Sequence, residues 1–212
     1  MGQTAGKPSS APETAMTRAA DPAISDEELM VRVREQNDQD AFAVLVSRHQ
    51  QNLLNYFVRS GVQYDGEDLV QQTFLRIFRY RNRYVPSAKF TTFLLLVARQ
   101  VWLDELRKRK RRERGEVPMP EEPVDAPVQQ DVSDTQHVEN RQDVLRLLET
   151  LPDGLRQVIV LGVFEERPYA EIGRILGIPE GTVKSRMFHA LARMREFLQN
   201  DESGSPMKGK KK

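Results

Sequence analysis

The chain has 212 residues and a formal net charge of +1, so it can form one or two small domains and its overall charge is unremarkable. It contains no cysteine, which excludes disulfides and thiolate metal sites and is consistent with a reducing cytoplasm. The three histidines, His49, His137 and His189, lack ligand spacing, and no apolar run approaches the roughly 20 residues of a membrane span. We therefore expect no metal, no cofactor and no membrane insertion.

The average charge hides a strong separation of sign along the chain. Residues 79–114 carry 12 Lys and Arg against three acids, a net of +9. Residues 116–137 carry six acids and neither Lys nor Arg, a net of −6. A basic segment, which suits a phosphate backbone, is thus followed at once by an acidic one.

Helical periodicity begins after a polar N-terminal tail. Residues 1–24 are rich in Gly, Ser, Thr, Pro and Ala without an apolar signal core, and we expect them to be disordered. Ser25, with Glu28 three residues later, has the form of a capping box and predicts a helix to Gln36. Residues 41–59 form a second predicted helix, whose inner side holds Phe42, Leu45, Val46, His49, Leu53 and Tyr56 or Phe57. No strand alternation appears, so the predicted fold class is all-α.

A third helix is predicted over residues 65–83, with an inner face made of Val70, Thr73, Phe74, Ile77 and Phe78. Leu75 lies on the opposite face among polar side chains, Asp68, Gln71, Gln72, Arg76 and Arg79. An apolar residue ringed by polar groups is typical of a protein-docking surface. A single exposed Leu is also ordinary on proteins, and this helix alone leaves both interpretations open.

A long fourth helix, predicted over residues 91–114, joins aromatic side chains to a basic end. Its inner face is expected to hold Phe93, Leu94, Val97, Val101 and Leu103 or Leu106. Seven Lys and Arg residues follow between positions 107 and 114. Aromatic rings beside cations can stack unpaired bases and follow a phosphate backbone. Phe93 and Trp102 fit either this role or an ordinary core.

Composition then indicates a break between two small helical domains. Residues 115–137 hold four prolines among acids and glutamines, which predicts an extended, flexible acidic linker. Helical periodicity resumes at about Val138, and a further helix is expected over residues 155–164. The final segment, residues 201–212, ends in lysines and is predicted to be a disordered basic tail.

Residues 169–195 have the pattern of a helix-turn-helix. Pro168 suits the first turn of a helix, Gly177 ends that helix, Pro179 prevents its continuation, and Thr182 is expected to cap the next one. The second helix has an apolar stripe that should be its buried side, Val183, Met187, Ala190, Leu191, Met194 and Leu198. Its opposite face is centred on Ser185, His189 and Ala192, with Lys184, Phe188, Arg186 and Arg193 at the edges. This is the face that a DNA major groove would meet.

The order of these motifs resembles that of the bacterial extracytoplasmic-function (ECF) sigma factors, within the sigma-70 family, over residues 25–198. The motif Glu67-Asp-Leu-Val-Gln-Gln-Thr-Phe74 is similar to the core-polymerase-binding helix of that family. Leu151-Pro-Asp-Gly-Leu-Arg-Gln-Val-Ile-Val160 and Gly181-Thr-Val-Lys-Ser-Arg186 also match it. The resemblance implies sigma region 2 at residues 25–114, an acidic linker at 115–137 and sigma region 4 at 138–200. The helix-turn-helix alone also resembles that of LuxR-type response regulators.

The resemblance implies three binding surfaces and no enzymatic activity. Core polymerase would bind Asp68, Gln71, Gln72, Leu75 and Arg79. The opened minus-ten strand would bind Lys89, Phe90, Thr91, Phe93, Arg99, Gln100 and Arg107. The duplex minus-thirty-five element would bind Thr182, Lys184, Ser185, Arg186, Phe188, His189 and Arg193. Three positions depart from the family pattern: Phe93 replaces a usual Trp, Gln100 an Asn, and His189 an Arg that could read guanine with two hydrogen bonds.

The implied partners are core RNA polymerase, through its β and β′ subunits, promoter DNA and an anti-sigma factor, all in the cytoplasm. An alternative is a helix-turn-helix repressor or activator that works outside the polymerase and binds a palindrome as a dimer. The absence of a receiver or ligand domain and the surface around Leu75 count against it. An enzyme acting on nucleic acid would need a general base, metal ligands or a phosphate loop, and the sequence shows none of these patterns.

Overall fold

The regular elements are all helices in the part of the chain that the structure, a computed structural model, describes, residues 24–115 and 135–204. The predicted all-α fold is therefore confirmed. The predicted N-terminal tail, except for Ile24, the linker between residues 116 and 134, and the chain after Gly204 lie outside the described residues. No helix in the described ranges is long and apolar enough to cross a bilayer.

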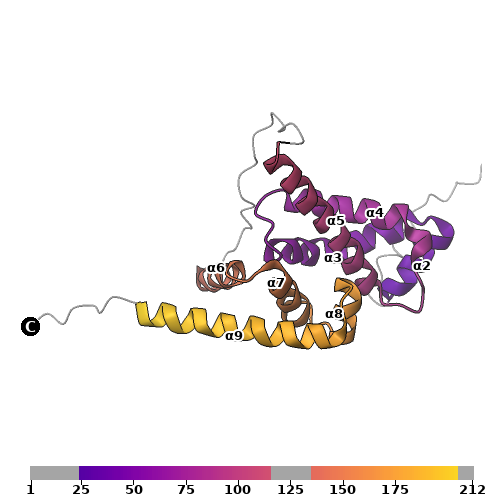
Figure 1. Cartoon of the computed structure of the whole chain (residues 1–212). Helices are drawn as coiled ribbons and strands as arrows, with labels where there is room; N and C mark the ends of the chain where they lie inside the picture. The colour runs from indigo at the N-terminus through magenta and orange to yellow at the C-terminus, as the bar shows by residue number, and fades with distance from the viewer. Residues whose placement is uncertain (1–23, 116–134, 205–212) are drawn as a thin grey trace, which may run out of the picture.

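The N-terminal bundle consists of four α-helices and one 3-10 turn: α2 (Asp26–Gln36), α3 (Gln39–Arg59), α4 (Gly66–Arg79), η1 (Arg81–Arg83) and α5 (Phe90–Glu113). Consecutive helices pack on one another, α2 on α3, α3 on α4 and α4 on α5 (Figure 1). Their facing sides bury a continuous apolar core that includes Leu45, Phe57, Ile77 and Val101. Burial of such side chains is the main stabilising contribution to a small helical bundle.

Local hydrogen bonds explain where the first helices begin. The Ser25 hydroxyl accepts a hydrogen bond of 3.1 Å from the backbone N–H of Glu28, so Ser25 is the N-cap of α2, as predicted. The carboxylate of Glu28 binds Arg32 at 2.8 Å. Asp38 caps α3 in the same way, through the N–H of Ala41 at 2.9 Å, so α3 begins two residues before the predicted start.

The predicted helix over residues 65–83 is wrong at its end. Helix α4 ends at Arg79, and the chain then makes a separate 3-10 turn, η1. The N–H of Tyr80 still donates to the carbonyl of Arg76 at 2.8 Å, but Tyr80 itself has left the helical conformation. The periodicity of the sequence did not reveal this break, because Phe78 before it and Arg81 after it keep the spacing of three that a continuous helix would have.

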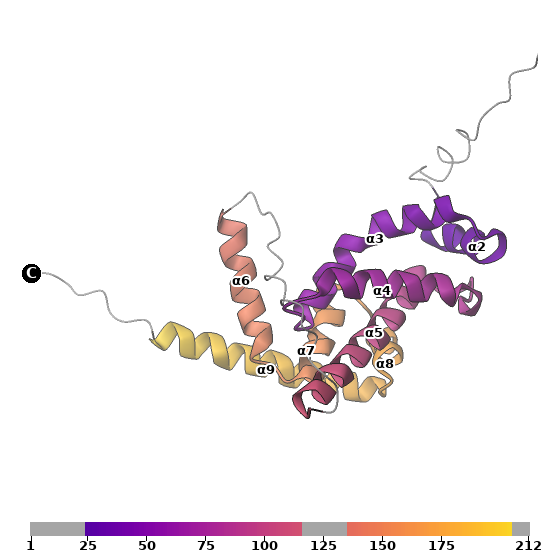
Figure 2. The same ribbon diagram turned by 90° about the horizontal axis from the view of Figure 1, so that it is seen from above.

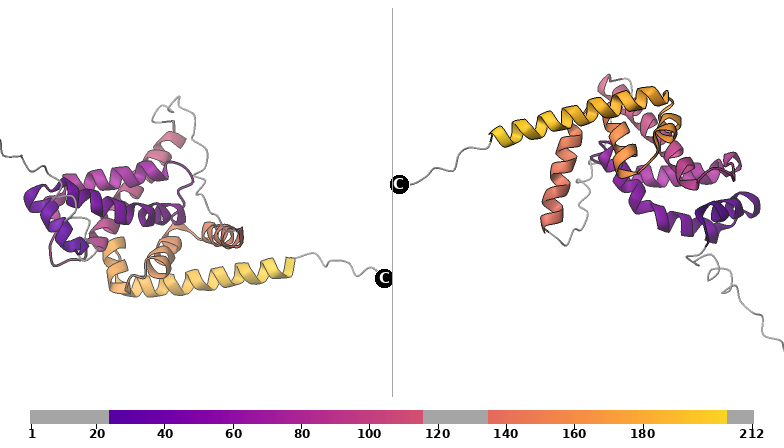
Figure 3. Two further views of the ribbon diagram at one scale, coloured as in Figure 1. Left: turned by 180° about the vertical axis from the view of Figure 1, so that it is seen from behind. Right: turned by 90° about the horizontal axis from the view of Figure 1, so that it is seen from below.

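The C-terminal bundle contains α6 (Thr135–Glu149), α7 (Asp153–Ile159), α8 (Tyr169–Leu176) and α9 (Glu180–Gly204), with a π-helical turn, η2 (Val160–Phe164), after α7. Helices α7 and α8 pack on one side of α9, which projects past them (Figures 2 and 3). Helix α6 begins inside the segment predicted to be linker. The helix predicted over residues 155–164 begins two residues early and becomes the π turn, in which the N–H of Glu165 bonds to the carbonyl of Val160 at 3.1 Å.

The two bundles are in contact. Helix α8 packs against α5, and Figure 1 shows α7 and α8 lying against the side of the N-terminal bundle formed by α3 and α5. The buried Tyr56 hydroxyl of α3 donates to Gln157 Oε1 of α7 at 3.2 Å. The Arg59 guanidinium lies over the ring of Phe164, 4.5 Å from its centroid. Polar as well as apolar contacts therefore hold the bundles together.

Candidate protein and nucleic-acid interfaces

The outer face of α4 is an exposed polar surface with one large apolar side chain at its centre. Leu75 is 69% exposed. Around it, all exposed, are Asp68, Gln71, Gln72 and Arg79. The opposite side of the helix buries Thr73, Phe74 and Ile77 and half-buries Val70 and Phe78, as the 100° periodicity predicted. The five predicted polymerase-contacting residues therefore share one accessible face, called here the α4 face.

Contacts beneath the α4 face hold the helix in place. Arg76 binds Asp104 of α5 through an ion pair of 2.7 Å. The Thr73 hydroxyl donates to the carbonyl of Leu69 at 2.7 Å, which satisfies the one buried polar side chain of this helix. The exposed residues of the α4 face are thus presented on a helix anchored by both packing and an ion pair, as a binding surface requires.

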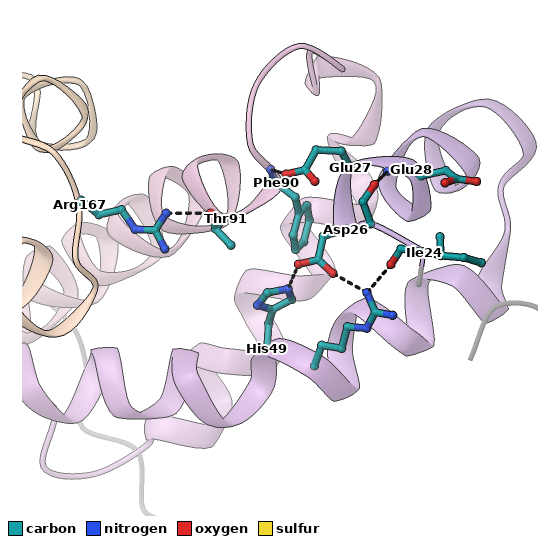
Figure 4. Close-up of polar contacts among 10 residues, drawn as sticks. Ile24, Asp26, Glu27, Glu28, His49, Phe90, Thr91 and Arg167 are labelled. Carbon is teal, nitrogen blue, oxygen red and sulfur yellow. Dashed lines mark hydrogen bonds and ion pairs between the residues drawn. The ribbon is translucent and has the colours of Figure 1, made fainter. Parts of the chain in front are cut away.

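The beginning of α5 is fixed by residues of α2 and α3 (Figure 4). The N–H of Phe90 donates to the Glu27 carboxylate at 2.9 Å, so an acid from another helix caps α5. The neighbouring Asp26 carboxylate lies 2.6 Å from the Nε2 atom of His49 and accepts a 2.9 Å bond from Arg48. Burial, followed by the charges of Glu27 and Asp26, raises the pKa of nearby Tyr84 to about 12.

Phe90 corrects one sequence-based prediction. Its ring is fully buried, at 0% exposure, and packs on His49 with ring centroids 5.3 Å apart. A side chain in that position cannot stack on a base, so its predicted contact with the minus-ten strand is not supported. Trp102 is also in the core, and the Arg109 guanidinium lies 5.7 Å from its ring centroid. Of the two roles that the sequence left open for Trp102, base stacking and core packing, the structure therefore supports core packing.

The other predicted strand-contacting residues lie at accessible or half-buried positions of α5. Lys89, just before the helix, Gln100 and Arg107 are exposed, and Arg107 pairs with Asp104 at 2.9 Å. Phe93 is half-buried against Tyr84, with ring centroids 5.5 Å apart. Its ring is therefore part of the packing at the start of α5 without being enclosed by it.

The remaining two residues, Thr91 and Arg99, contact the C-terminal bundle. Arg167 donates to the Thr91 hydroxyl at 2.9 Å (Figure 4). Arg99 donates to the carbonyl of Leu176 at 3.0 Å. Burial lowers the pKa of Arg99, the nearby Tyr56 opposes this, and the positive charge of Arg186 lowers it further. Both predicted strand contacts are therefore hydrogen-bonded to residues of the C-terminal bundle.

Sequence reasoning missed three residues at this contact. The Thr92 hydroxyl donates to Glu171 Oε1 of α8 at 2.7 Å. Glu171 also lies 3.6 Å from Arg167, four residues earlier, and Glu171 is buried although it is charged. The only sequence signal was the spacing of four between Arg167 and Glu171, which is typical of an ordinary solvated ion pair.

The basic end of α5 encloses one acid that the charge count did not distinguish. The Glu105 carboxylate is buried, and three cations surround it: Arg109 at 3.4 Å, Lys108 at 3.7 Å and Arg112 at 3.9 Å. A buried carboxylate is tolerated where cations compensate it. Part of the basic block therefore has a structural task in addition to any contact with phosphate.

The outer face of α9 agrees with the predicted groove-facing side. Ser185, His189 and Arg193 are exposed, and Phe188 is 70% exposed with its ring 5.6 Å from that of His189. Lys184 is exposed and binds Glu180 at 2.9 Å, and this hydrogen bond raises the pKa of Lys184. Arg186 is half-buried and lies next to Gly154 of α7. These side chains form the α9 face.

Two predictions about α9 are wrong in detail. The helix begins at Glu180, and the carbonyl of Pro179 accepts from the N–H groups of Thr182 and Val183 at 2.9 and 3.1 Å, so Thr182 lies inside the first turn and does not cap it. The predicted apolar stripe is buried only in part. Leu198, at 50% exposure, lies near the end of the helix, whereas Leu191, at 47% exposure, lies at the edge of the stripe, about 80° around the helix from the buried Val183.

Comparisons with known proteins match both bundles. The family model of sigma-70 region 2 matches residues 45–112, and that of sigma-70 region 4 matches residues 141–194. Neither is the model of an enzyme. The ECF RNA polymerase sigma factor SigW of Bacillus subtilis is 31% identical over 194 residues, which cover 82% of this chain and 99% of that protein. The chain belongs to the ECF sigma factors.

A further sigma factor sequence and a solved sigma factor structure are also similar to this chain. The ECF RNA polymerase sigma factor SigE of Mycolicibacterium smegmatis is 32% identical over 163 residues, which cover 75% of this chain and 62% of that longer protein. The solved structure of the sigma factor RpoE with the anti-sigma factor NepR, from Bartonella quintana, has a TM-score of 0.58 and 22% identity and covers 74% of this chain and 96% of that one. The latter similarity supports the fold.

Membership of the family decides between the functional alternatives. The protein is a sigma factor, which binds core RNA polymerase and directs promoter-specific initiation. A repressor or activator that works outside the polymerase is not favoured, because the region 2 match covers most of the N-terminal bundle, which such a regulator does not need.

Proposed function

We propose that this sigma factor binds core polymerase through the α4 face, with Asp68, Gln71, Gln72, Leu75 and Arg79 in contact. The observation that carries this assignment is the exposure of Leu75, at 69%, on a helix whose other side is anchored in the core. A large apolar side chain on a fixed, polar-rimmed surface gains free energy when a partner buries it.

The minus-ten strand is assigned to the polar side of α5, part of which is in contact with Arg167 and α8. Lys89, Thr91, Phe93, Arg99, Gln100 and Arg107 remain the proposed contacts, and Phe90 is withdrawn. Lys89 and Arg107 would bind phosphates at the two ends of the site, and Phe93 can stack on an unpaired base if it moves off Tyr84. A Phe in place of the usual Trp offers a smaller stacking surface at that position.

The duplex minus-thirty-five element is assigned to the α9 face. Lys184, Ser185, Arg186, Phe188, His189 and Arg193 are the proposed contacts, with Thr182 near a phosphate at the start of the helix. Phe188 is exposed at the middle of this face, where an aromatic ring can pack on a thymine methyl group. The side chains contacting bases would give specificity, and the cations contacting phosphates would give affinity.

The broader proposal places the protein in the cytoplasm, as two domains at residues 25–114 and 138–200, with no catalysis of its own. An anti-sigma factor is a proposed partner because the sigma factor RpoE of similar fold was solved in complex with one. Co-purification with core polymerase, followed by mapping of transcript starts after overexpression, tests the role. Absence of core binding, together with no new transcript start, would exclude it.

The α4 face is tested by Leu75→Arg. The added charge should abolish capture by core polymerase without unfolding the chain, since the side chain contributes nothing to the core. Val85→Arg is a matched control, because Val85 is a similarly exposed apolar residue, at 59%, outside the α4 face. Equal core binding by the parent and Leu75→Arg chains would show that the face is assigned wrongly.

The α9 face is tested by Lys184→Ala and Arg186→Ala. Both should reduce promoter-dependent transcription and leave core binding unchanged, because one positive charge is lost from the DNA contact. Arg195→Ala removes the same charge from the same helix, about three turns beyond Lys184, and should have little effect. Unchanged transcription from every mapped promoter would contradict the assignment.

A further inference from the structure

His189 lies at the middle of the exposed side of α9. Its side chain is exposed, as are those of Ser185 one turn before it and Arg193 one turn after it. Helices α7 and α8 pack on the opposite side of α9, where Val183 and Ala190 are buried (Figure 1). Residues four apart are about 6 Å apart along a helix axis, so the three exposed side chains project in one row. A duplex bound to this row therefore meets His189 at its centre.

The His189 imidazole has an aromatic neighbour but no hydrogen bond or ion pair with another residue in the described part of the chain. The Phe188 ring stands edge-on to it, with the ring centroids 5.6 Å apart and the ring planes at 76°. This contact restricts the orientations that the imidazole can adopt. Both ring nitrogens thus remain available to a ligand, on a ring whose position is partly fixed.

The charged groups around His189 do not fix the charge of its ring. Arg186 and Arg193, three and four residues away, are cations on the same side of α9. Glu196 is exposed two turns further on, and Asp153 of α7 is exposed and pairs within its own helix. No carboxylate therefore binds the ring. Histidine is the side chain whose charge ordinarily changes between pH 5 and 8, so a bound ligand can decide the charge here.

Duplex DNA distinguishes the two charge states of a histidine. A neutral imidazole has one N–H donor and one acceptor, whereas the protonated ring has two donors and no acceptor. In the major groove guanine presents two acceptors, N7 and O6, whereas adenine presents the N7 acceptor beside the N6 amino donor. A cation placed at N7 is therefore attracted by the O6 atom of guanine and repelled by the N6 group of adenine. Its hydrogen bond is also about twice as strong as a neutral one.

We propose that His189 binds a guanine of the minus-thirty-five element in its protonated form, so that this sigma factor prefers guanine at that position more strongly as pH falls. The inference rests on the proposed role of the α9 face and assigns the base that His189 recognises. Guanine and the DNA phosphates favour the protonated ring, so binding takes up a proton. The added preference is present on the acid side of the range and is lost as pH rises toward 8.

Competition among promoter variants measures this preference. The duplexes carry each of the four bases at each position of the minus-thirty-five element of a mapped promoter, and they compete for the holoenzyme in one mixture at pH 6.0 or pH 8.0. All duplexes share the polymerase, so its own response to pH cancels in the ratio of two bound duplexes. At one position the ratio of guanine to adenine should be about fivefold higher at pH 6.0, since charged hydrogen bonds exceed neutral ones by about this factor or more.

Three substitutions assign the effect to His189. His189→Gln keeps a donor and an acceptor but does not titrate, so the ratio at that position should be the same at both pH values. His189→Arg is charged at both, and should prefer guanine equally at pH 6.0 and pH 8.0. His137→Gln removes a histidine outside the α9 face and is the matched control, which should behave as the parent does. All three should bind core polymerase as the parent does.

The outcomes separate this proposal from the proposed function. If the parent holoenzyme shows no base preference in the minus-thirty-five element at either pH, the assignment of the α9 face fails. If the parent selects bases there but its guanine ratio at every position is the same at pH 6.0 and pH 8.0, the role of His189 is overturned. A pH-dependent guanine ratio that persists in His189→Gln overturns it as well, because another group would then carry the proton.

Discussion

Replacement of Arg156 by Ala should destabilise the C-terminal bundle by about 2 kcal/mol. The Arg156 side chain of α7 is only 14% exposed, and its guanidinium binds three backbone carbonyls at the end of α6. The bonds run to Leu148 at 2.9 Å, Leu151 at 3.0 Å and Glu149 at 3.3 Å. The last carbonyls of a helix have no partner within it, so this one side chain fastens α6 to α7.

The magnitude follows from what replaces these bonds. A hydrogen bond to a charged group contributes about 1.5–3 kcal/mol. Water can reach part of the end of α6 and bind some of the freed carbonyls, so the loss should resemble that of one full bond more than that of three. Arg156→Lys keeps the charge without the planar fork and should recover only part of the stability. Arg146→Ala removes an exposed Arg, paired with Asp143 at 3.7 Å, and should change the free energy of unfolding very little.

The loss of stability can be measured by urea unfolding, monitored with two spectroscopic probes. Far-UV circular dichroism reports all helices, whereas the fluorescence of Trp102 reports the N-terminal bundle alone. Arg156→Ala should lower the midpoint of the circular dichroism transition more than that of the fluorescence transition. Coincidence of both midpoints with those of the parent would show that the carbonyls do not depend on the guanidinium, and the reasoning would be refuted.

Three further changes test local features. Gly173→Ala should destabilise the helix-turn-helix by about 1–3 kcal/mol in thermal melts, because the added Cβ would lie 2.8 Å from the carbonyl oxygen of Ile178. Gly181→Ala is the control: Gly181 has open space around it, so this substitution should be neutral or stabilising. Ser25→Ala should cost about 1 kcal/mol in the same measurement through loss of the cap of α2, and no change would contradict that role. Burial raises the pKa of Glu165, so ionisation of this side chain destabilises the fold as pH rises. Glu165→Gln should therefore have a higher melting temperature than the parent at neutral pH. This difference should vanish below about pH 4, where the Glu165 carboxyl is protonated in both the folded and the unfolded chain. A constant difference across pH would refute this.

Local patterns were sufficient for the faces of individual helices. The periodicity of α4 predicted correctly that Phe74 and Ile77 are buried and that Leu75 is exposed. The same argument separated the buried Val183 from the exposed His189 on α9. These predictions succeed because the position of a residue around a helix follows from its number alone, and one side of each helix must cover the core.

The ends of the helices and the contacts between the two bundles could not be predicted from local sequence patterns. The end of α4, the π turn and the start of α9 depend on backbone hydrogen bonds that several sequences would allow equally well. Phe90 was assigned to DNA and lies in the core, since a ring at a helix start can turn either way. Leu191 was assigned to the core and is half-exposed, because it lies at the edge of the apolar stripe, about 80° around the helix from the buried Val183.

The sequence by itself determined an all-α chain of two parts, the side of each main helix that faces the core, and the motifs that place the chain among the ECF sigma factors. Only the tertiary structure decided that Thr92 and Arg99 contact α8, and that Thr91 contacts Arg167 just before it. Such side chains can hydrogen-bond equally well to water, to a phosphate or to another helix, so no local sequence pattern distinguishes these environments. The choice depends on which distant element arrives beside them, and that is a property of the packed chain.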